Sequence, residues 1–590
     1  MPPLVLATVI LAGAGLTPAQ RALLSEPARR VTPPPFSFAA PAGPSFTEAQ
    51  KAAQRAAGGT VVPLVTAACE AGRDSVRLLP GDYRFGQEHW GPTGVISPLE
   101  FNGLRRPDDH PLLIDATGCT FWFDLADDQT PTEHFCLGFR DCANLILRGA
   151  TLDRGTPGLI EGRITAFDAP GQRIEIELSP GITLPAKFNN DLNQRLVPFK
   201  ADGRFVAPLY ALQAGGRRLM YGPPTPGTQP GRVWVPLPDP ALFQTLADPA
   251  WARRYGEAGL LRVGDGLCLV YSVAESIGLR NCRHLTLDGL DVYVTKAAGV
   301  EADGDGGHLW HNCYFGPRPG TSRWHGADGF LFCATRQGPT LDGLTIVHTT
   351  DDVLNIHGFW GLVRGVEGRR VTFDRNPPAG WAVPRGATAG DRVAFYDPAD
   401  ARPLGRARVT AAEGDAVVLD GEVAARSGVV AEWLDHECGD WLIQRCDFHD
   451  CYQRLMLQSG PGLLRDCLLT RLGSSVEFNS VLAGHVGEGS VPRDITVRGN
   501  TFTDVSPMPG GAALTCYFRA ARQPTTPLLS GLTLTGNTIH AAAGAAIRLD
   551  GVDGATINGN RLSGTVGEPV VLTACRAVTV GDNTLEEPAK

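Results

Sequence analysis

The chain has 590 residues, of which 43% are hydrophobic and 19% are charged, and it carries a formal net charge of −9. This length and composition allow a large core or several domains and exclude general disorder. The acidic balance argues against nucleic acid as the main partner. The sequence has no stretch of about 18 apolar residues, so a membrane span is not predicted. The 71 glycines and 46 prolines indicate many turns and favour an all-β fold.

Residues 1–30 have the features of a leader for export. An apolar run from Leu4 to Leu16 is followed by small residues, which suits a cut near Ala19. No Lys or Arg precedes the run, because the first basic residue is Arg21. We therefore expect a secreted or periplasmic protein whose signal is atypical, or whose true start lies further upstream.

Residues 31–160 predict the first coils of a solenoid. From about Ala49, apolar strands alternate with turns, as in VRLLPGDYRF and NLILRGATLD. Residues 161–267 lose this pattern and instead show strand pairs such as GRITAFD and QRIEIELS with Pro-rich turns. This change predicts a small β-barrel inserted into the solenoid.

The coil pattern returns over residues 268–361 with NCRHLTLDGLDVYV. Residues 362–433 again show short strands, as in RRVTFD and DRVAFYD, which predict a second inserted barrel. Coils then resume over residues 434–590. The predicted fold is all-β, a right-handed parallel β-helix with two inserted small β-barrel domains.

A repeat near the C-terminus supports the solenoid. The Gly-Asn pairs ending at Asn537 and Asn560, and the variant GDN ending at Asn583, are spaced by 23 and 23 residues. A period of this length with short β-rich pieces is typical of coils that cannot bury their apolar faces alone. Residues one period apart should therefore stack on neighbouring coils.

Two coils can be aligned directly, CDFHDCYQRLMLQS and CLLTRLGSSVEFNS. Period-two alternation places Leu455 and Leu457 inward, and leaves Gln458 and Glu477 on the outer face. The same register points Asn355 and His357 outward in one polar column.

The 14 cysteines include no C-x-x-C pair. Several lie within apolar strand-like runs, as Cys313 and Cys333 do. Cys446 and Cys467 are 21 residues apart, close to one coil. This spacing predicts small core residues stacked inside the solenoid, not zinc ligands or a disulfide framework.

Three carboxylates, Asp328, Asp351 and Asp352, are the leading catalytic candidates. Asp351 lies 23 residues after Asp328, which is one coil, and coils of parallel strands sit roughly 4.8 Å apart. Acids this close raise one another's pKa through like-charge repulsion. An acidic turn or a cation site is the alternative interpretation.

Clustered carboxylates without His/Cys metal spacing, a Gly-x-Ser-x-Gly elbow or a phosphate loop favour acid/base work on a neutral substrate. Glycoside hydrolysis fits best. It needs one acid to protonate the leaving oxygen and a second carboxylate to activate water or attack carbon.

The segment GPRPGTSRWHGADGF, the 23-residue step to the Asp351-Asp352 pair and the following N-I-H-G resemble the α-1,3-galactosidases of glycoside hydrolase family 110. Members of that family are parallel β-helices with inserted β-barrels, and the likeness extends over most of the chain. The resemblance implies that Asp328, Asp351 and Asp352 are essential acids and that no metal or organic cofactor is needed. It also implies release of terminal α-1,3-linked galactose with inversion, from blood group B-type or linear glycans.

Inverting enzymes hold acid and base about 6.5 to 9.5 Å apart, which neighbouring coils can provide. The chain departs from the family pattern at Val353, where many relatives have a smaller residue. It also has Gln458 and Glu477 on the following coils instead of an obvious Lys or Arg.

Two alternatives remain. A polygalacturonase-like hydrolase also uses an Asp followed by a D-D pair, but adds a His-Gly on a further coil and a basic R-I-K strand. Here His357 is close to the pair and the later strand is RLML at Arg454. A non-catalytic carbohydrate-binding solenoid, such as an adhesin or tailspike-like scaffold, would not explain three clustered acids, because charges facing a neutral sugar are costly to desolvate.

The expected partner is a glycan with terminal α-galactose, and a homodimer is one assembly that the sequence allows. Aromatic rings near the acids could stack on the apolar face of galactose, and outward polar side chains could hydrogen-bond to it. The predicted substrate-binding residues are Trp324, His325, Asn355, His357, Trp360, Gln458 and Glu477.

Overall fold

The computed structural model describes the chain from residue 15 to residue 586, with gaps. The residues left out between these ends are 33–35, 40–43, 87–96, 125–134, 155–158, 185–194, 205–221, 238–260, 271–274, 294–298, 320–327, 375–382, 385, 483–486, 508–509, 523, 525–526 and 542–543.

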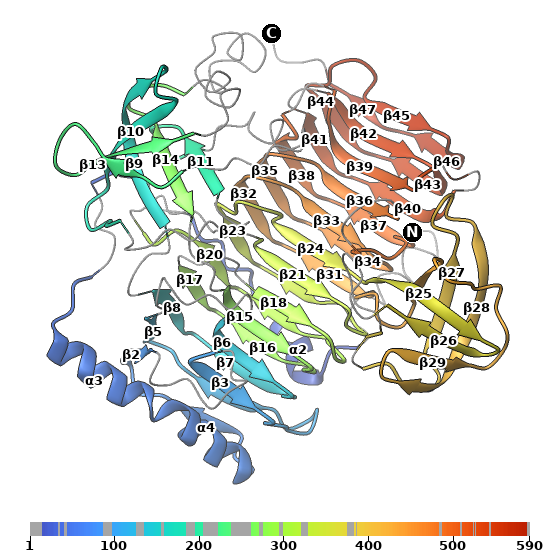
Figure 1. The fold of residues 1–590 in the computed structure, drawn as a ribbon, viewed down its shortest axis with the longest axis horizontal. Helices are drawn as coiled ribbons and strands as arrows, with labels where there is room; N and C mark the ends of the chain where they lie inside the picture. Colours follow the sequence, from blue (N-terminus) through green and yellow to red (C-terminus); the bar gives the residue numbers. More distant parts are fainter. Residues whose placement is uncertain are drawn as a thin grey trace.

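Three long parallel sheets form the body of the protein, as Figure 1 shows, and together they make the predicted parallel β-helix. Each coil contributes in turn one strand to sheet 1, one to sheet 2 and one to sheet 3. Sheet 1 contains β1 (Ser75–Arg77), β4 (Leu112–Asp115), β7 (Leu145–Arg148), β16 (Thr286–Asp288), β19 (Leu309–His311), β22 (Thr340–Asp342), β31 (Trp441–Gln444), β34 (Gly462–Arg465), β37 (Ile495–Arg498), β40 (Leu529–Thr535), β43 (Val552–Asn558) and β46 (Arg576–Gly581).

Sheets 2 and 3 repeat this order. Sheet 2 contains β2 (Gly81–Phe85), β5 (Cys119–Phe123), β8 (Thr151–Arg154), β17 (Asp291–Tyr293), β20 (Tyr314–Gly316), β23 (Thr345–Val347), β32 (Asp447–Cys451), β35 (Leu468–Leu472), β38 (Thr501–Val505), β41 (Thr538–Ala541), β44 (Arg561–Ser563) and β47 (Thr584–Leu585). Sheet 3 contains β3 (Leu99–Asn102), β6 (Phe135–Arg140), β15 (Glu275–Arg280), β18 (Gly299–Ala302), β21 (Phe330–Cys333), β24 (Leu354–His357), β33 (Leu455–Gln458), β36 (Val476–Val481), β39 (Ala512–Arg519), β42 (Ala545–Asp550) and β45 (Val570–Thr573).

The core lies between the three sheets and is filled by the inward side chains of each strand. Leu455 stacks on Val476, and both are fully buried, as predicted from the alternation. All 14 cysteines are free, and 12 of them are buried. Their predicted role as small core residues is therefore confirmed.

The predicted 23-residue stack near the C-terminus is an asparagine ladder. Asn537 Nδ2 donates to Asn560 Oδ1 at 3.0 Å, and Asn560 Nδ2 donates to Asn583 Oδ1 at 2.9 Å. Asn560 Nδ2 also donates to the carbonyl of Leu534, and Asn560 Oδ1 accepts from the amide of Asn537. Each asparagine thus satisfies backbone groups at a corner where no strand can pair them.

We expect Asn560→Ala to lower the free energy of unfolding by about 1–3 kcal/mol, because the Leu534 carbonyl and the Asn537 amide lose a buried partner. Thr556→Ala, on an exposed position of the same repeat, is the matched control and should change it by less than about 0.5 kcal/mol. Denaturant unfolding measures both. Equal effects of the two substitutions would mean that the ladder does not stabilise the fold.

The prediction that coils begin at about Ala49 is wrong, because the first strand begins at Ser75. The chain forms helix α3 (Glu48–Gly58) and helix α4 (Val61–Glu70) before the first strand. Thr47 and Gln50 make a reciprocal capping box that starts α3. Figure 1 shows both helices beside β2 and β3, at the end of the solenoid, where they cover the first coil. A terminal cover of this kind protects an otherwise open apolar coil.

Residues 15–26 lie along the outer face of sheet 1, and residues 27–31 continue past the corner at Asn312 to sheet 2, where the Val31 amide donates to Thr345 Oγ1 at 3.5 Å. A short helix, α2 (Pro18–Leu23), carries Gln20, whose Nε2 donates to the Gly307 carbonyl at 3.1 Å. Leu16 and Thr17, which precede the proposed cut near Ala19, are also buried. Among the described helices, none is long and apolar enough to cross a membrane.

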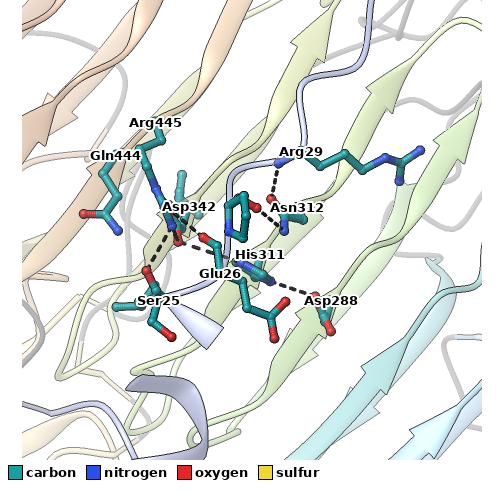
Figure 2. A network of polar contacts seen from close by, with 12 residues as sticks. Ser25, Glu26, Arg29, Asp288, His311, Asn312, Asp342, Gln444 and Arg445 are labelled. Atoms are coloured by element: carbon teal, nitrogen blue, oxygen red, sulfur yellow. Dashed lines mark hydrogen bonds and ion pairs between the residues drawn. The ribbon is translucent and has the colours of Figure 1, made fainter. Parts of the chain in front are cut away.

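Figure 2 shows how this N-terminal segment is held by polar contacts. Arg445 donates to the carbonyls of Glu26 and Leu24, at 2.9 and 3.1 Å, while its Nε donates to Asp342 Oδ1 at 2.7 Å. Beneath the segment, the fully buried His311 bonds Asp288 through Nδ1 at 2.8 Å. These side chains therefore hold neighbouring coils together and attach the N-terminal segment to them.

The first insertion lies between β8 and β15. Its described strands are β9 (Leu159–Asp168), β10 (Arg173–Leu178), β11 (Arg195–Phe199), β12 (Thr225–Pro226), β13 (Arg232–Pro236) and β14 (Gly266–Val270). They form one antiparallel sheet in the order β11-β14-β9-β10-β13-β12, with its own apolar core. The described strands of this insertion therefore make an open sheet, not the closed barrel that the sequence predicted. Tyr452 of the solenoid is buried in that core, which fixes the domain against the corner between sheets 2 and 3.

The second insertion lies between β24 and β31 and is a closed barrel, as predicted. Its strands are β25 (Trp360–Glu367), β26 (Arg370–Phe373), β27 (Arg392–Tyr396), β28 (Pro403–Glu413), β29 (Ala416–Leu419) and β30 (Val430–Trp433). Figure 1 shows sheet 3 running between the two inserted domains, with the barrel on one side and the antiparallel sheet on the other.

Candidate active site

The three aspartates meet at the corner between sheets 2 and 3. Phe330 of β21 pairs with Leu354 of β24, so Asp328 and Asp352 lie two residues before the paired ends of neighbouring strands. The amide of Asp352 donates to Asp328 Oδ1 at 3.2 Å. The predicted clustering of the three acids is confirmed, but the stacked pair differs from the prediction. Asp328 is in register with Asp352, 24 residues later, and not with Asp351.

One carboxylate oxygen from each of Asp328, Asp351 and Asp352 lies within 4.8 Å of the others. Asp352 is 4% exposed, and the other two are partly buried. The trio is tighter than the separation of about 6.5–9.5 Å expected between an inverting acid and base. The same oxygens have the chemistry of ligands for a divalent cation such as Mg²⁺ or Ca²⁺.

Arg454 joins the acids to the next two coils. Its Nε donates to Asp352 Oδ1 at 3.1 Å, and its Nη1 donates to Glu477 Oε2 at 3.0 Å. The expectation that the following coil lacks an obvious basic residue is therefore wrong. Arg454 immediately precedes β33, one coil beyond Asp352, and the barrel separates the two residues by 102 positions in the chain.

Glu477 is held by several donors besides Arg454. Asn479 Nδ2 and the Tyr517 hydroxyl donate to its Oε2 at 2.7 and 2.9 Å, and Ser474 Oγ donates to its Oε1 at 3.3 Å. Burial is the main factor that raises the pKa of the Tyr517 hydroxyl, and the nearby Glu477 carboxylate adds to it. Tyr517 therefore stays a donor at ordinary pH, and Glu477 is a rigid member of the site.

Asp352 differs from an ordinary carboxyl in its proton affinity. Burial raises the pKa of Asp352 to about 8, with further raising from Asp351, Glu488 and Glu477, against the lowering effect of Arg454. Near neutral pH, Asp352 therefore keeps its proton. Because Arg454 Nε donates to Oδ1, Oδ2 is the natural position of that proton.

The outward column of sheet 3 continues from the acids. Asn355, His357 and Gln458 are 4%, 2% and 3% exposed, and β24 and β33 place His357 beside Gln458, as predicted. His357 Nδ1 bonds the Gly358 carbonyl at 2.6 Å, and since a carbonyl only accepts, Nδ1 carries a hydrogen and Nε2 of the neutral imidazole is an acceptor.

Three buried acceptors in this column have no hydrogen-bond partner among the described residues. They are His357 Nε2, Asn355 Oδ1 and Gln458 Oε1. Buried polar atoms are normally paired, so such a group calls for a ligand or water that donates. Hydroxyl groups of a sugar are donors of the required kind.

A segment following β36 explains why these outward side chains are buried. The amide of Ser490 donates to the Gln458 carbonyl at 3.1 Å, and Phe359 and Glu488 form an antiparallel bridge. Residues 487–490 thus lie across the ends of β24 and β33. This crossing also brings Glu488 near enough to raise the pKa of Asp352, although burial is the larger cause.

The predicted role of Trp360 as a stacking platform disagrees with its packing. Trp360 is 5% exposed, and its ring packs edge-on against Tyr396 of the barrel at 5.7 Å between centroids. A Cβ on Gly489 would lie 2.1 Å from Trp360 Nε1, so that backbone also lies directly on the indole. Trp360 therefore joins the barrel to the solenoid. Trp324 and His325 lie outside the described residues.

The pKa of Asp352 has a consequence for stability. Folded Asp352 keeps its proton up to about pH 8, whereas the unfolded carboxyl releases it near its ordinary pKa of about 3.9. Between these values the folded state binds more protons, so this residue's contribution to stability falls as pH rises.

We therefore expect Asp352→Asn to become increasingly stable relative to the wild type as the pH rises from about 5 to 8. Melting temperatures of both proteins across this range measure the difference. Asp504→Asn, at an exposed position, is the control for the removal of one surface carboxylate. A constant difference between Asp352→Asn and wild type would mean that Asp352 titrates normally.

The fold and site define a parallel β-helix protein with a carboxylate cluster on one corner. The sequence matches no protein-family model and no curated protein. Among solved structures, the chain is similar to the A-module of the Azotobacter vinelandii mannuronan C-5 epimerase AlgE6, with 10% identity, a TM-score of 0.38 and coverage of 90% of this chain and 95% of that one.

It is also similar to a polygalacturonase from Erwinia carotovora ssp. carotovora, with 11% identity, a TM-score of 0.35 and coverage of 95% of this chain and 100% of that one. A third likeness is to the gp54 tailspike of Acinetobacter baumannii bacteriophage AP22, solved with a capsular saccharide, with 10% identity, a TM-score of 0.20 and coverage of 89% and 73%. Identities and TM-scores this low give no basis for transferring a substrate or mechanism.

Proposed function

We propose that the protein is a glycoside hydrolase that releases terminal α-1,3-linked galactose from neutral glycans, with Asp352 as the general acid. The observation that carries this proposal is Asp352 itself. It is a carboxyl that keeps its proton near neutral pH, next to two further carboxylates. Glycoside hydrolysis requires such a division between a protonated and an ionised acid.

The surroundings of the acids favour a neutral substrate. Five carboxyl groups gather at the site, those of Asp328, Asp351, Asp352, Glu477 and Glu488, and Arg454 already donates to two of them. Among the described residues of this corner, the Arg454 guanidinium is already committed to Asp352 and Glu477, so a uronate carboxylate would meet a surplus of like charge. This argues against a polygalacturonase-like activity.

The three buried acceptors in the outward column of sheet 3, which have no partner among the described residues, support a hydroxyl-rich ligand. They are acceptors only, and the hydroxyl groups of a pyranose can donate to them. The choice of α-1,3-galactose rests on the resemblance of the segment around Asp328 and the Asp351-Asp352 pair to the family 110 enzymes. Export from the cytoplasm is part of the same proposal and rests on the apolar N-terminus.

The stereochemical course depends on the second carboxylate. The trio is close to the separation of about 5–5.5 Å typical of retaining enzymes. Inversion, which the resemblance implies, would pair Asp352 with a carboxylate outside the trio. Arg454 donates one hydrogen bond to Asp352 and another to Glu477, so the two carboxylates are at most two hydrogen bonds and one guanidinium width apart. The upper end of this separation lies within the range of about 6.5–9.5 Å expected for inverting enzymes.

Proton NMR of Gal-α-1,3-Gal and of its fucosylated trisaccharide with purified protein tests the proposal. Early release of β-galactose would support an inverting α-galactosidase, and early α-galactose would support retention. Digalacturonic acid serves as the acidic control substrate. Cleavage of digalacturonic acid alone, or no release from any of the three, would contradict the proposed activity.

A further inference from the structure

A cavity lined by both polar and apolar side chains lies on the outer face of sheet 2, away from the outward column of sheet 3. Its volume is about 610 Å³, which is within the range of about 300–1,000 Å³ typical of small-molecule sites. Its floor is formed by side chains of β32 and β35, including Asp447, His449 and Thr470. Figure 1 shows these two strands beside the first inserted domain.

The strand register explains why these side chains share one floor. His449 pairs with Thr470, and Asp447 pairs with Leu468 two residues earlier on the same strands. The intervening Phe448 and Leu469 are fully buried in the core, so the paired residues on either side of them face outward. Period-two alternation thus brings three hydrogen-bonding side chains to one surface.

The walls come from two distant parts of the chain. Residues 30–32 and Phe36 form one wall, and residues 202–204 of the first inserted domain form another. Phe36 packs edge-on against Phe199 at 5.4 Å between centroids, so the N-terminal wall is anchored to that domain's core. The cavity therefore forms only when the N-terminal segment, the first inserted domain and the solenoid are assembled.

The charges that line the cavity cancel in pairs. Arg471 Nε donates to Asp450 Oδ1 at 2.6 Å, and Arg204 Nε donates to Asp202 Oδ2 at 2.7 Å. Asp447 and Arg30 remain, and they are opposite in sign. No hydrogen bond to the Asp447 carboxylate is recorded within the described part of the chain, and burial raises the pKa of Asp447.

The pairing of charges in the lining favours a neutral ligand over an anion or a cation. An anion would meet the Asp447 carboxylate, while two of the three arginines are already engaged. A cation would find one uncommitted carboxylate, and the described residues that meet the geometry of a metal cluster are the three acids of the other site. A neutral ligand with many hydroxyl groups can donate to Asp447, exchange hydrogen bonds with His449 and Thr470, and place an apolar face near Phe36.

We propose that this cavity is a second saccharide-binding site, which holds a neutral glycan without cleaving it. His348 at its edge is three residues before Asp351, so the cavity approaches the acids from the sheet 2 side. A site in this position would keep a long or branched glycan on the protein while another part of it occupies the acidic corner. The effect is that of a linked second binding event, which raises overall avidity.

The test uses the full chain with Asp352→Asn, so that glycans stay intact. Calorimetry and saturation-transfer NMR are run with three neutral probes, Gal-α-1,3-Gal-β-1,4-Glc, maltotriose and xylotriose, and with trigalacturonic acid. Thr470→Trp should fill the cavity and abolish binding of a neutral probe there, and Asp447→Asn should weaken it about tenfold. Thr503→Trp is the matched control, because Thr503 pairs with Thr470 on the next strand and does not line the cavity.

Thr470→Trp in the otherwise unaltered protein should leave the initial rate on a disaccharide unchanged, which separates this site from the catalytic one. The proposal is overturned if no neutral probe loses binding in either cavity variant, or if Thr503→Trp has the same effect as Thr470→Trp. Tighter binding of trigalacturonic acid in the cavity would also overturn it.

Discussion

Asp352→Asn is expected to lower kcat/KM for Gal-α-1,3-Gal by about 10²–10⁴-fold, the usual contribution of a general acid. Wild-type Asp352 is protonated near neutral pH, so the asparagine replaces a neutral group by a neutral group of the same shape. Its carbonyl oxygen can still accept from Arg454 Nε. The loss of rate should therefore not come from unfolding.

A substrate with a better leaving group identifies the role. 2,4-Dinitrophenyl α-galactoside needs little protonation of its leaving oxygen, so Asp352→Asn should lose much less rate on it than on the disaccharide. Asp351→Asn and Asp328→Asn should lose about the same rate on both substrates if these residues activate water or attack carbon. Equal losses on both substrates for Asp352→Asn would contradict the acid assignment.

The pH profile adds an independent measurement. Because the pKa of Asp352 is raised to about 8, wild-type kcat/KM should fall as the pH rises above about 8. Asp352→Asn should lack this alkaline limb. If kcat/KM of the variant still falls above about pH 8, the alkaline limb belongs to another titrating group.

The solenoid and the clustering of the acids could be predicted because both depend on local sequence. Alternation with period two fixes which side chains of β33 and β36 face inward, and a fixed coil length fixes which residues stack. The asparagine ladder at Asn537, Asn560 and Asn583 follows from the same period.

The pairing of Arg454 with Asp352 could not be predicted in this way. The barrel adds residues between two coils that are neighbours in space, so the pair is hidden by the 102-residue separation. Glu488 was missed for a similar reason, since it reaches the site from a segment that folds back across β24 and β33. Helix α3 did have a local signal, the capping box at Thr47 and Gln50, but the apolar alternation of the surrounding chain obscured it. Helix α4 has no such side-chain cap.

Arg454→Met is expected to have the largest effect on stability, lowering the free energy of unfolding by about 3–5 kcal/mol. The substitution leaves the Glu477 carboxylate, whose side chain is 7% exposed, without its cation. Arg465→Met is the matched control. Arg465 has a similar exposure of 29%, its Nε donates at 2.8 Å to the neutral Gln444, and the carboxylate that it approaches, Asp466 at 3.9 Å, is 59% exposed and so stays solvated when Arg465 is removed. Loss of this hydrogen bond in Arg465→Met should lower the free energy of unfolding by about 1 kcal/mol.

The double variant Arg454→Met/Glu477→Gln separates the ion pair from simple packing. Removing the uncompensated charge should restore a large part of the lost stability, giving a coupling energy of about 1–3 kcal/mol in the double-mutant cycle. Arg454 also lowers the pKa of Asp352, so the alkaline limb of kcat/KM in Arg454→Met should move to higher pH. Additive stability effects together with an unmoved limb would mean that Arg454 acts on neither carboxylate. Coupling together with a moved limb would show that one guanidinium both stabilises the corner and sets the pH at which Asp352 gives up its proton.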